Sequence, residues 1–185
     1  TTANALSWVF ACLSRFPSWQ LAVKRELDEV VGDREPEVAD AMKLPVMRRV
    51  FDEALRLYPP AWAIGRSVDG DDEVLGYHLP KGSIALVVPY VAHRIARVWP
   101  NPEGFDPDRF LPGEEAKRPK FSYFPFSGGP RVCIGSGFAI LESQIILATI
   151  LKRFRLDLVP GHPLVPDPAI TLRPKYGVRV VLARA

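Results

Sequence analysis

A single cysteine lies in a glycine-rich loop at residues 126–135, whose sequence is FSGGPRVCIG. Cys133 comes just before a long apolar segment, and the free N–H groups and dipole at the start of a helix favour the thiolate form of a cysteine. The thiolate is the form that binds metals and attacks electrophiles. The glycines leave room for a flat ligand against the backbone, and Arg131 offers a planar, permanently charged partner for a carboxylate. The loop therefore predicts a thiolate-based binding site, and a buried structural cysteine in a tight turn is the alternative.

Other residues suited to metal binding are sparse. Cys12 is the only further cysteine, so at most one disulfide can form and the cysteines alone cannot build a structural zinc site. None of the three histidines, His78, His93 and His162, is spaced i, i+4 from another, which argues against a histidine-based metal site on one helix face. The 24 basic and 21 acidic residues are interspersed, so we expect no nucleic acid as a partner.

No membrane or export signal is visible in the sequence. The best apolar run, residues 84–88, is followed at once by Pro89 and is far shorter than the roughly 18 residues that predict a transmembrane helix. Residues 1–10 lack an initiating Met and the basic region of a signal peptide. We expect no transmembrane segment in this part, and we expect the chain to begin inside a longer protein.

Periodicity and chain breakers predict the helices around the loop. Apolar residues at helical spacing predict helices at residues 1–15, 18–31, 45–58 and 136–153. Ser18 is expected to cap the second of these helices. The fourth helix is apolar on nearly all sides, so we expect it to be buried.

Short strands are predicted between the helices and at the end of the chain. Runs of β-branched residues bounded by Gly and Pro lie at residues 62–68 and 83–88, with two further strands at 155–159 and 176–182. They indicate a small, mostly antiparallel sheet. The segment 99–130 shows no periodicity, and an irregular stretch of this length in a compact domain is usually functional.

The cysteine loop resembles the haem-binding signature of the cytochrome P450 family, F-x-x-G-x-R-x-C-x-G, at all its fixed positions. The resemblance implies that Cys133 is the axial thiolate ligand of the iron in haem b (iron protoporphyrin IX), with Phe126 and Gly135 beside the cofactor. The implied fold is mainly α with small antiparallel β-sheets, as in the C-terminal, proximal part of the cytochrome P450 fold.

Two arginines are the expected partners of the haem propionates. Pro59-Pro60 followed by Arg66 resembles the family segment whose arginine meets a propionate. Arg131, inside the cysteine signature, is the second candidate. His93-Arg94 resembles another pair of the family near its meander, where His93 is either part of the site or simply structural.

Three charged residues resemble a further element of the family. Glu53-x-x-Arg56 matches its Glu-x-x-Arg motif, and Pro107-Asp108-Arg109-Phe110 resembles the meander motif, with Asp108 where the family usually has Glu. By the resemblance, Glu53, Arg56 and Arg109 form a buried ion network that fixes the cysteine loop at a cost in desolvation. The alternative is an exposed i, i+3 ion pair of the kind found on many helices.

The first residues and two loops resemble the side of the family's pocket where substrate binds. Thr1 and Thr2 look like the end of the family's threonine motif on the distal helix, so Thr1 is expected to help deliver protons during oxygen activation, unless it merely caps a helix. Residues 61–64 and 166–171 correspond to two substrate-contacting loops. The expected substrate contacts are Ala61, Trp62, Ala63, Ile64 and Ile170.

The resemblance spans essentially the whole chain as one partial domain. Its expected parts are the end of the distal helix (1–15), the third helix (45–58), the meander (99–125), the cysteine loop (126–135), the buried helix (136–153) and the C-terminal hairpin (155–185).

The implied activity is that of a haem-thiolate monooxygenase, which inserts one oxygen atom from O2 into a hydrophobic organic substrate. Electrons would come from NAD(P)H through a ferredoxin or a reductase-type partner, and the expected location is cytoplasmic, with any anchor in the upstream part. The fragment alone is expected to be inactive. The alternatives are a haem-binding module without catalysis, a peroxygenase that uses peroxide, and a haem-free structural domain.

Overall fold

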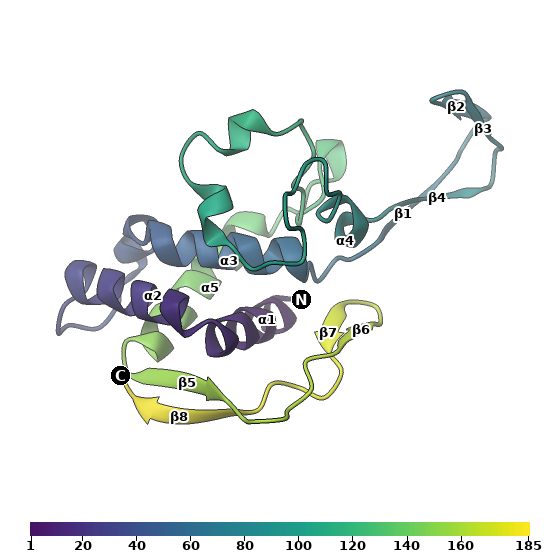
Figure 1. The fold of residues 1–185 in the computed structure, drawn as a ribbon. Coiled ribbons are helices and arrows are strands. Elements are labelled where there is room, and N and C mark those ends of the chain that lie inside the picture. The colour runs from purple at the N-terminus through teal and green to yellow at the C-terminus, as the bar shows by residue number, and fades with distance from the viewer.

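The structure is a computed structural model that describes residues 1–185. Four longer helices form its body, and Figure 1 shows α1, α2 and α3 gathered in front of α5. The α-helices are α1 (Thr2–Arg15), α2 (Pro17–Val30), α3 (Pro45–Leu57), the short α4 (Pro89–Ala92) and α5 (Ser136–Leu151). Four 3₁₀ turns join them, η1 (Val38–Lys43), η2 (Pro107–Phe110), η3 (Glu115–Lys117) and η4 (Gly129–Arg131).

The strands form four separate antiparallel pairs instead of one small sheet. The first two pairs extend to one side of the helical body as an arm, and the other two lie below α1 (Figure 1). The pairs are β1 (Ile64–Ser67) with β4 (Ile84–Val87), β2 (Asp72–Val74) with β3 (Tyr77–Leu79), β5 (Phe154–Leu158) with β8 (Val180–Arg184), and β6 (Pro166–Pro168) with β7 (Leu172–Pro174).

The helix bounds follow from proline at the first helical position. Pro17 and Pro45 begin α2 and α3, where a residue without an N–H costs nothing and the fixed φ suits the helix. The prediction that Ser18 caps α2 was wrong, because Phe16 is the N-cap residue and Ser18 already lies inside the helix. The last strand begins at Val180 rather than Tyr176, since Gly177 turns the chain with φ +69°.

The hydrophobic core lies between α1, α2, α3, α5 and β5. Trp8 of α1 stacks on Tyr58 with the ring centroids 4.0 Å apart. The buried side chain of Gln20 ties α2 to two neighbours. Its Nε2 donates to the carbonyl oxygens of Leu13 (3.2 Å) and Leu156 (2.9 Å), and its Oε1 accepts the N–H of Leu156 (2.6 Å). This side chain joins α1, α2 and β5 at the bottom of the core.

Helix α5 differs from the prediction of a helix buried on all sides. Leu147, Ala148 and Leu151 are buried, but Phe138 near its first turn is 71% exposed. A helix with apolar residues on every face is expected to be shielded from water on several sides. Its sequence does not show which other segment or ligand covers each side. Here the N-terminal half of α5 lines a cavity.

Candidate cofactor-binding site

A cavity of about 600 Å³ separates the start of α1 from the cysteine loop. Its walls come from α1, α3, the segment after α3, the cysteine loop and α5. The lining residues are Thr1, Thr2, Ala5, Phe51, Leu55, Pro60, Ala61, Ile64, Arg66, Pro125, Phe126, Ser127, Arg131, Cys133, Gly135, Phe138, Ala139, Glu142 and Ser143. The cavity therefore brings together segments that lie far apart in the sequence.

Cys133 presents a free, exposed thiol to this cavity. The loop around it is held by its own backbone, since the N–H of Cys133 donates to the carbonyl oxygen of Phe126 (2.9 Å) and the N–H of Ser136 donates to that of Cys133 (3.2 Å). Helix α5 begins at Ser136, so the thiol lies beside the first free N–H groups of a helix. The fold thus supports the loop while leaving the sulfur accessible.

Three positions in the loop require glycine, or favour it, for different geometric reasons. Gly129 has φ +67°, a conformation that residues with a Cβ rarely adopt. A Cβ on Gly128 would lie 2.7 Å from Cε1 of Phe121, so a side chain there would clash with that ring. A Cβ on Gly135 would lie 4.0 Å from Sγ of Cys133, directly beside the thiol. Two of the glycines shape the loop, and the third keeps the space next to the sulfur open.

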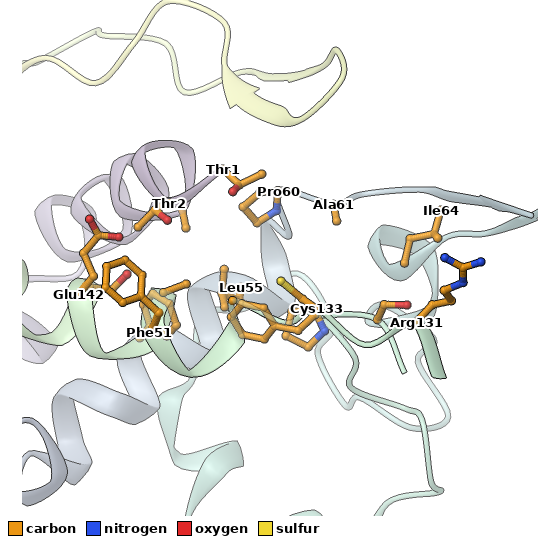
Figure 2. Close-up of a pocket in the computed structure, with 18 of the residues that line it drawn as sticks. Thr1, Thr2, Phe51, Leu55, Pro60, Ala61, Ile64, Arg131, Cys133 and Glu142 are labelled. Atoms are coloured by element: carbon orange, nitrogen blue, oxygen red, sulfur yellow. The ribbon is translucent and has the colours of Figure 1, made fainter. Parts of the chain in front are cut away.

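The polar groups of the cavity lie at both of its ends, with the thiol between them. Figure 2 shows Arg131 and Ile64 at one end, Thr2 and Glu142 at the other, and Cys133 between them. Arg66 also lines the cavity, and its NH1 donates only to the carbonyl oxygen of Gly65 (2.9 Å). Two arginines with free donors can bind carboxylates in a bidentate manner.

The donor set and the walls fit a haem. A single free thiol suits an axial iron ligand, and the arginines suit a group that carries two carboxylates. Phe51, Leu55, Phe126 and Phe138 give the walls the apolar character that a flat macrocycle requires.

The structure brings together most, but not all, of the residues predicted for the site. Thr1, Thr2, Arg66, Phe126, Arg131, Cys133, Gly135, Ala61 and Ile64 all line the cavity. Trp62, Ala63 and Ile170 do not. Nε1 of Trp62 donates to the carbonyl oxygen of Ala169 (2.8 Å), and the side chain of Ile170 is fully exposed.

The sequence analysis missed one face of α5. Phe138, Ala139, Glu142 and Ser143 of α5 line the cavity at helical spacing. The sequence did not distinguish this face, because the other faces of the helix are apolar as well. The polar pair Glu142 and Ser143 was the available signal, since such residues are rarely placed in an apolar helix without a partner or a task.

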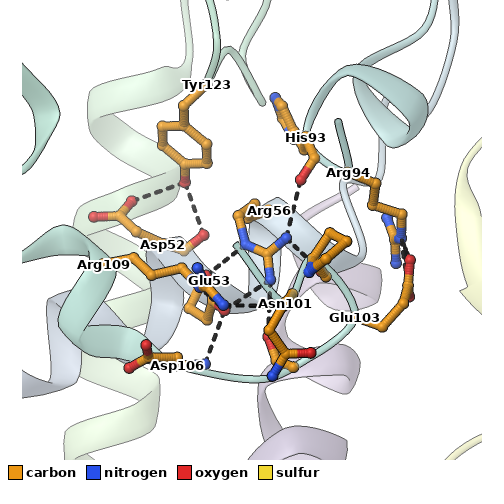
Figure 3. A network of polar contacts seen from close by, with 12 residues as sticks. Asp52, Glu53, Arg56, His93, Arg94, Asn101, Glu103, Asp106, Arg109 and Tyr123 are labelled. Carbon is orange, nitrogen blue, oxygen red and sulfur yellow. Dashed lines mark hydrogen bonds and ion pairs between the residues drawn. The ribbon is translucent and has the colours of Figure 1, made fainter. Parts of the chain in front are cut away.

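Phe51 and Leu55 of α3 line the cavity, and the opposite face of this helix carries Glu53 and Arg56. These two residues belong to a buried ion network (Figure 3). Glu53 and Arg56 are both 0% exposed and form two hydrogen bonds, from Nε to Oε2 (2.7 Å) and from NH2 to Oε1 (2.8 Å). Arg109 Nε lies 3.4 Å from Oε1 of Glu53, and the N–H of Asp106 donates to the same oxygen (2.8 Å). The three residues predicted to form a network therefore lie in contact.

Every N–H of the Arg56 guanidinium has an acceptor. Besides its bonds to Glu53, NH1 donates to the carbonyl oxygens of His93 (2.9 Å) and Pro102 (2.7 Å), and NH2 donates to that of Gly104 (2.9 Å). Burial raises the pKa of Glu53, while the hydrogen bonds and charge of Arg56 oppose this shift. The network ties α3 to three points of the chain between residues 93 and 104.

Comparisons with known proteins give a consistent result. The family model "Cytochrome P450" matches residues 1–180. Cyclooctatin synthase of Streptomyces melanosporofaciens is 44% identical over 172 residues, which cover 93% of this chain and 38% of that protein. Cytochrome P450 4V2 of Homo sapiens is 41% identical over 187 residues, which cover 100% of this chain and 36% of that protein.

Solved structures agree with the sequence relatives. The haem domain of a mutant cytochrome P450DA superimposes with a TM-score of 0.91 at 30% identity, covering 100% of this chain and 41% of that one. The chain thus spans less than half the length of the relatives it matches. None of its helices has the length and apolar character needed to cross a membrane.

Proposed function

Because this chain belongs to the cytochrome P450 family, we propose that the protein to which it belongs is a haem-thiolate monooxygenase. It transfers one oxygen atom from O2 to a hydrophobic organic substrate. The observation that carries this proposal is the free thiol of Cys133 in a cavity shared with two arginines and two threonines. Since the chain covers only part of its relatives, the proposal concerns the whole protein.

The residues of the cavity divide the task of holding haem b. Cys133 would provide the thiolate ligand, and Arg66 and Arg131 would bind the two propionates. Phe126 and Gly135 would contact the macrocycle beside the sulfur. When bound, the thiolate-ligated haem supplies the activation of O2 that no side chain of this chain can perform.

Proton handling falls to the start of α1. Thr1 is exposed, lines the cavity and makes no side-chain capping bond to its helix. Its hydroxyl is therefore free to donate and accept within the cavity. We assign Thr1 to proton delivery, with Thr2 beside it on the same wall.

The same cavity offers apolar contacts for a substrate. Ala61 and Ile64 line the cavity, and apolar walls with few polar groups favour hydrophobic ligands. Trp62, Ala63 and Ile170 would contact substrate only outside this cavity. NAD(P)H would supply electrons through a ferredoxin or a reductase-type protein.

Isotope labelling of the full-length protein tests the proposal. The haem-loaded protein, a reductase system and NADPH are incubated under ¹⁸O2 with a panel of fatty acids, terpenoids and aromatic compounds. One ¹⁸O atom in a hydroxylated or epoxidised product is the expected result. Product formed only with added peroxide would indicate a peroxygenase instead. Haem binding without turnover of any panel member under either condition would indicate a haem-binding module.

A further inference from the structure

His93 connects the ion network to the cysteine loop. It follows α4, and its N–H donates to the carbonyl oxygen of Pro89 (2.8 Å). Its own carbonyl oxygen accepts the bond from NH1 of Arg56 described above (Figure 3). The side chain is completely buried and packs against the rings of Tyr123 and Phe124, whose centroids are 5.3 and 5.1 Å from that of the imidazole.

The imidazole accepts a hydrogen bond from the segment just before the cysteine loop. The backbone N–H of Phe124 donates to Nε2 of His93 (3.0 Å). An N–H can donate only to an unprotonated nitrogen, so the proton of the neutral ring is on Nδ1. Burial lowers the pKa of His93 to about 3, which keeps Nε2 free to accept near neutral pH.

Phe124 passes this constraint on to the cysteine. The N–H of Ser127 donates to the carbonyl oxygen of Phe124 (3.0 Å), which closes a turn over residues 124–127. Inside that turn, the carbonyl oxygen of Phe126 accepts the N–H of Cys133 (2.9 Å). A continuous series of short contacts therefore runs from Arg56 through His93 and the turn to the residue that carries the thiol.

We propose that His93 is a positioning residue for the thiolate. Through its Nε2 acceptor, His93 holds the cysteine loop in a fixed position relative to the buried ion network. This role rests on the proposed haem-thiolate function, and it concerns only how the ligand is held. His93 lies outside the cavity and does not touch the cofactor site.

Three substitutions in the full-length holoprotein separate hydrogen bonding from packing. His93→Gln can place an amide oxygen near the position of Nε2, whereas His93→Asn can place one only near Nδ1. His93→Phe keeps an aromatic ring and removes the acceptor. The measurement is the rate at which the red-shifted band of the reduced carbon monoxide complex converts to the band of a haem without thiolate ligation.

We expect His93→Gln to convert at nearly the wild-type rate, and His93→Asn and His93→Phe to convert about ten-fold faster, the size expected for one buried unpaired N–H. Equal rates in all three variants, or a glutamine variant as fast as the asparagine variant, would overturn the proposal. If His93→Phe does not fold, the comparison of glutamine with asparagine decides.

A second measurement is independent of the variants and of the haem function. The ¹⁵N chemical shifts of His93 in the wild-type protein report which ring nitrogen carries the proton. We expect a protonated Nδ1 and an unprotonated Nε2, and the reverse assignment would remove the basis of the proposal. A wild-type protein that forms no thiolate band at all would refute the proposed function, while the nitrogen shifts would still report on the His93 contact.

Discussion

The ion network and the cysteine cavity lie on opposite sides of α3 and differ in how their polar groups are satisfied. All five N–H groups of Arg56 have protein acceptors, and both Arg56 and Glu53 are fully buried. Arg131 and Cys133 instead present exposed, free groups to a cavity. The difference shows that the residues that secure the backbone and those suited to chemistry are separate, although α3 touches both sets.

The largest effect should come from breaking the network. Glu53→Ala or Arg56→Ala leaves an uncompensated buried charge, which costs about 3–5 kcal/mol, a large part of the stability of a typical domain. We expect the variants to lose folded, haem-loaded protein, measured by soluble yield and by the ratio of haem to protein absorbance.

A matched control lies on α2. Lys24 and Asp28 form an i, i+4 pair that is 25% and 53% exposed. Lys24→Ala removes a solvated pair and should cost less than about 0.5 kcal/mol. Normal haem loading in Glu53→Ala or Arg56→Ala would show that the network does not secure the fold.

The next largest effect is a dependence of stability on pH. It tests whether His93, which links the two regions, is neutral in the folded protein. His93 has a pKa of about 3 in the folded protein and about 6.5 when unfolded. The folded state therefore binds fewer protons between these values, so the contribution of His93 to stability is complete above pH 6.5 and is lost as the pH falls toward 3. At pH 5 the loss relative to high pH is about 2 kcal/mol.

Urea unfolding of the wild type and of His93→Gln at several pH values measures this loss, because glutamine does not titrate. We expect the wild type to lose more stability than the variant on acidification. Parallel pH profiles for the two proteins would mean that His93 does not titrate on unfolding in this range.

An effect confined to the cavity should follow from Thr1. Thr1→Ala removes a hydroxyl that makes no structural bond, so the unfolding free energy should change by less than about 0.5 kcal/mol. Product formed per NADPH consumed should fall about ten-fold or more, because a positioned proton donor is lost. Thr1→Ser should restore most of the coupling, and full coupling in the alanine variant would remove Thr1 from the mechanism.

The smallest effect is expected where the meander departs from the family pattern. Asp108 pairs with Arg49 of α3, but its side chain is 53% exposed. Asp108→Asn should therefore cost no more than about 1 kcal/mol and leave haem loading unchanged. A loss comparable to that of Glu53→Ala would place Asp108 inside the network.

The sequence predicted the parts of both regions that depend on local spacing. The cysteine loop, the long helices and the motif of Glu53 and Arg56 are readable, because each is contained in a few consecutive residues. The link through His93 was not predicted, since its acceptor meets an N–H that lies 31 residues later in the chain. The family resemblance of residues 61–64 predicted that Trp62 contacts substrate, but its indole donates to the carbonyl oxygen of Ala169 and does not line the cavity.

The hydrogen bonds of the Gln20 side chain were not predicted, for the same reason. Its partner Leu156 lies 136 residues away, and nothing in the local pattern of α2 distinguishes a buried glutamine from an exposed one. The apolar residues on nearly all sides of α5 identified a helix that avoids water, but only the folded chain showed that Phe138 faces the cavity. Residue spacing therefore does not predict hydrogen bonds between side chains and backbone groups that lie far away in the sequence.

The most direct test of the account is the carbon monoxide difference spectrum of the reduced full-length protein with and without its cysteines. Cys133→Ala should abolish the red-shifted thiolate band while the ion network still folds the chain. Cys12→Ala is the matched control, because Cys12 is buried in the core, and it should leave the band in place. An unchanged thiolate band in Cys133→Ala would contradict the assignment of Cys133 as the iron ligand and with it the proposed function.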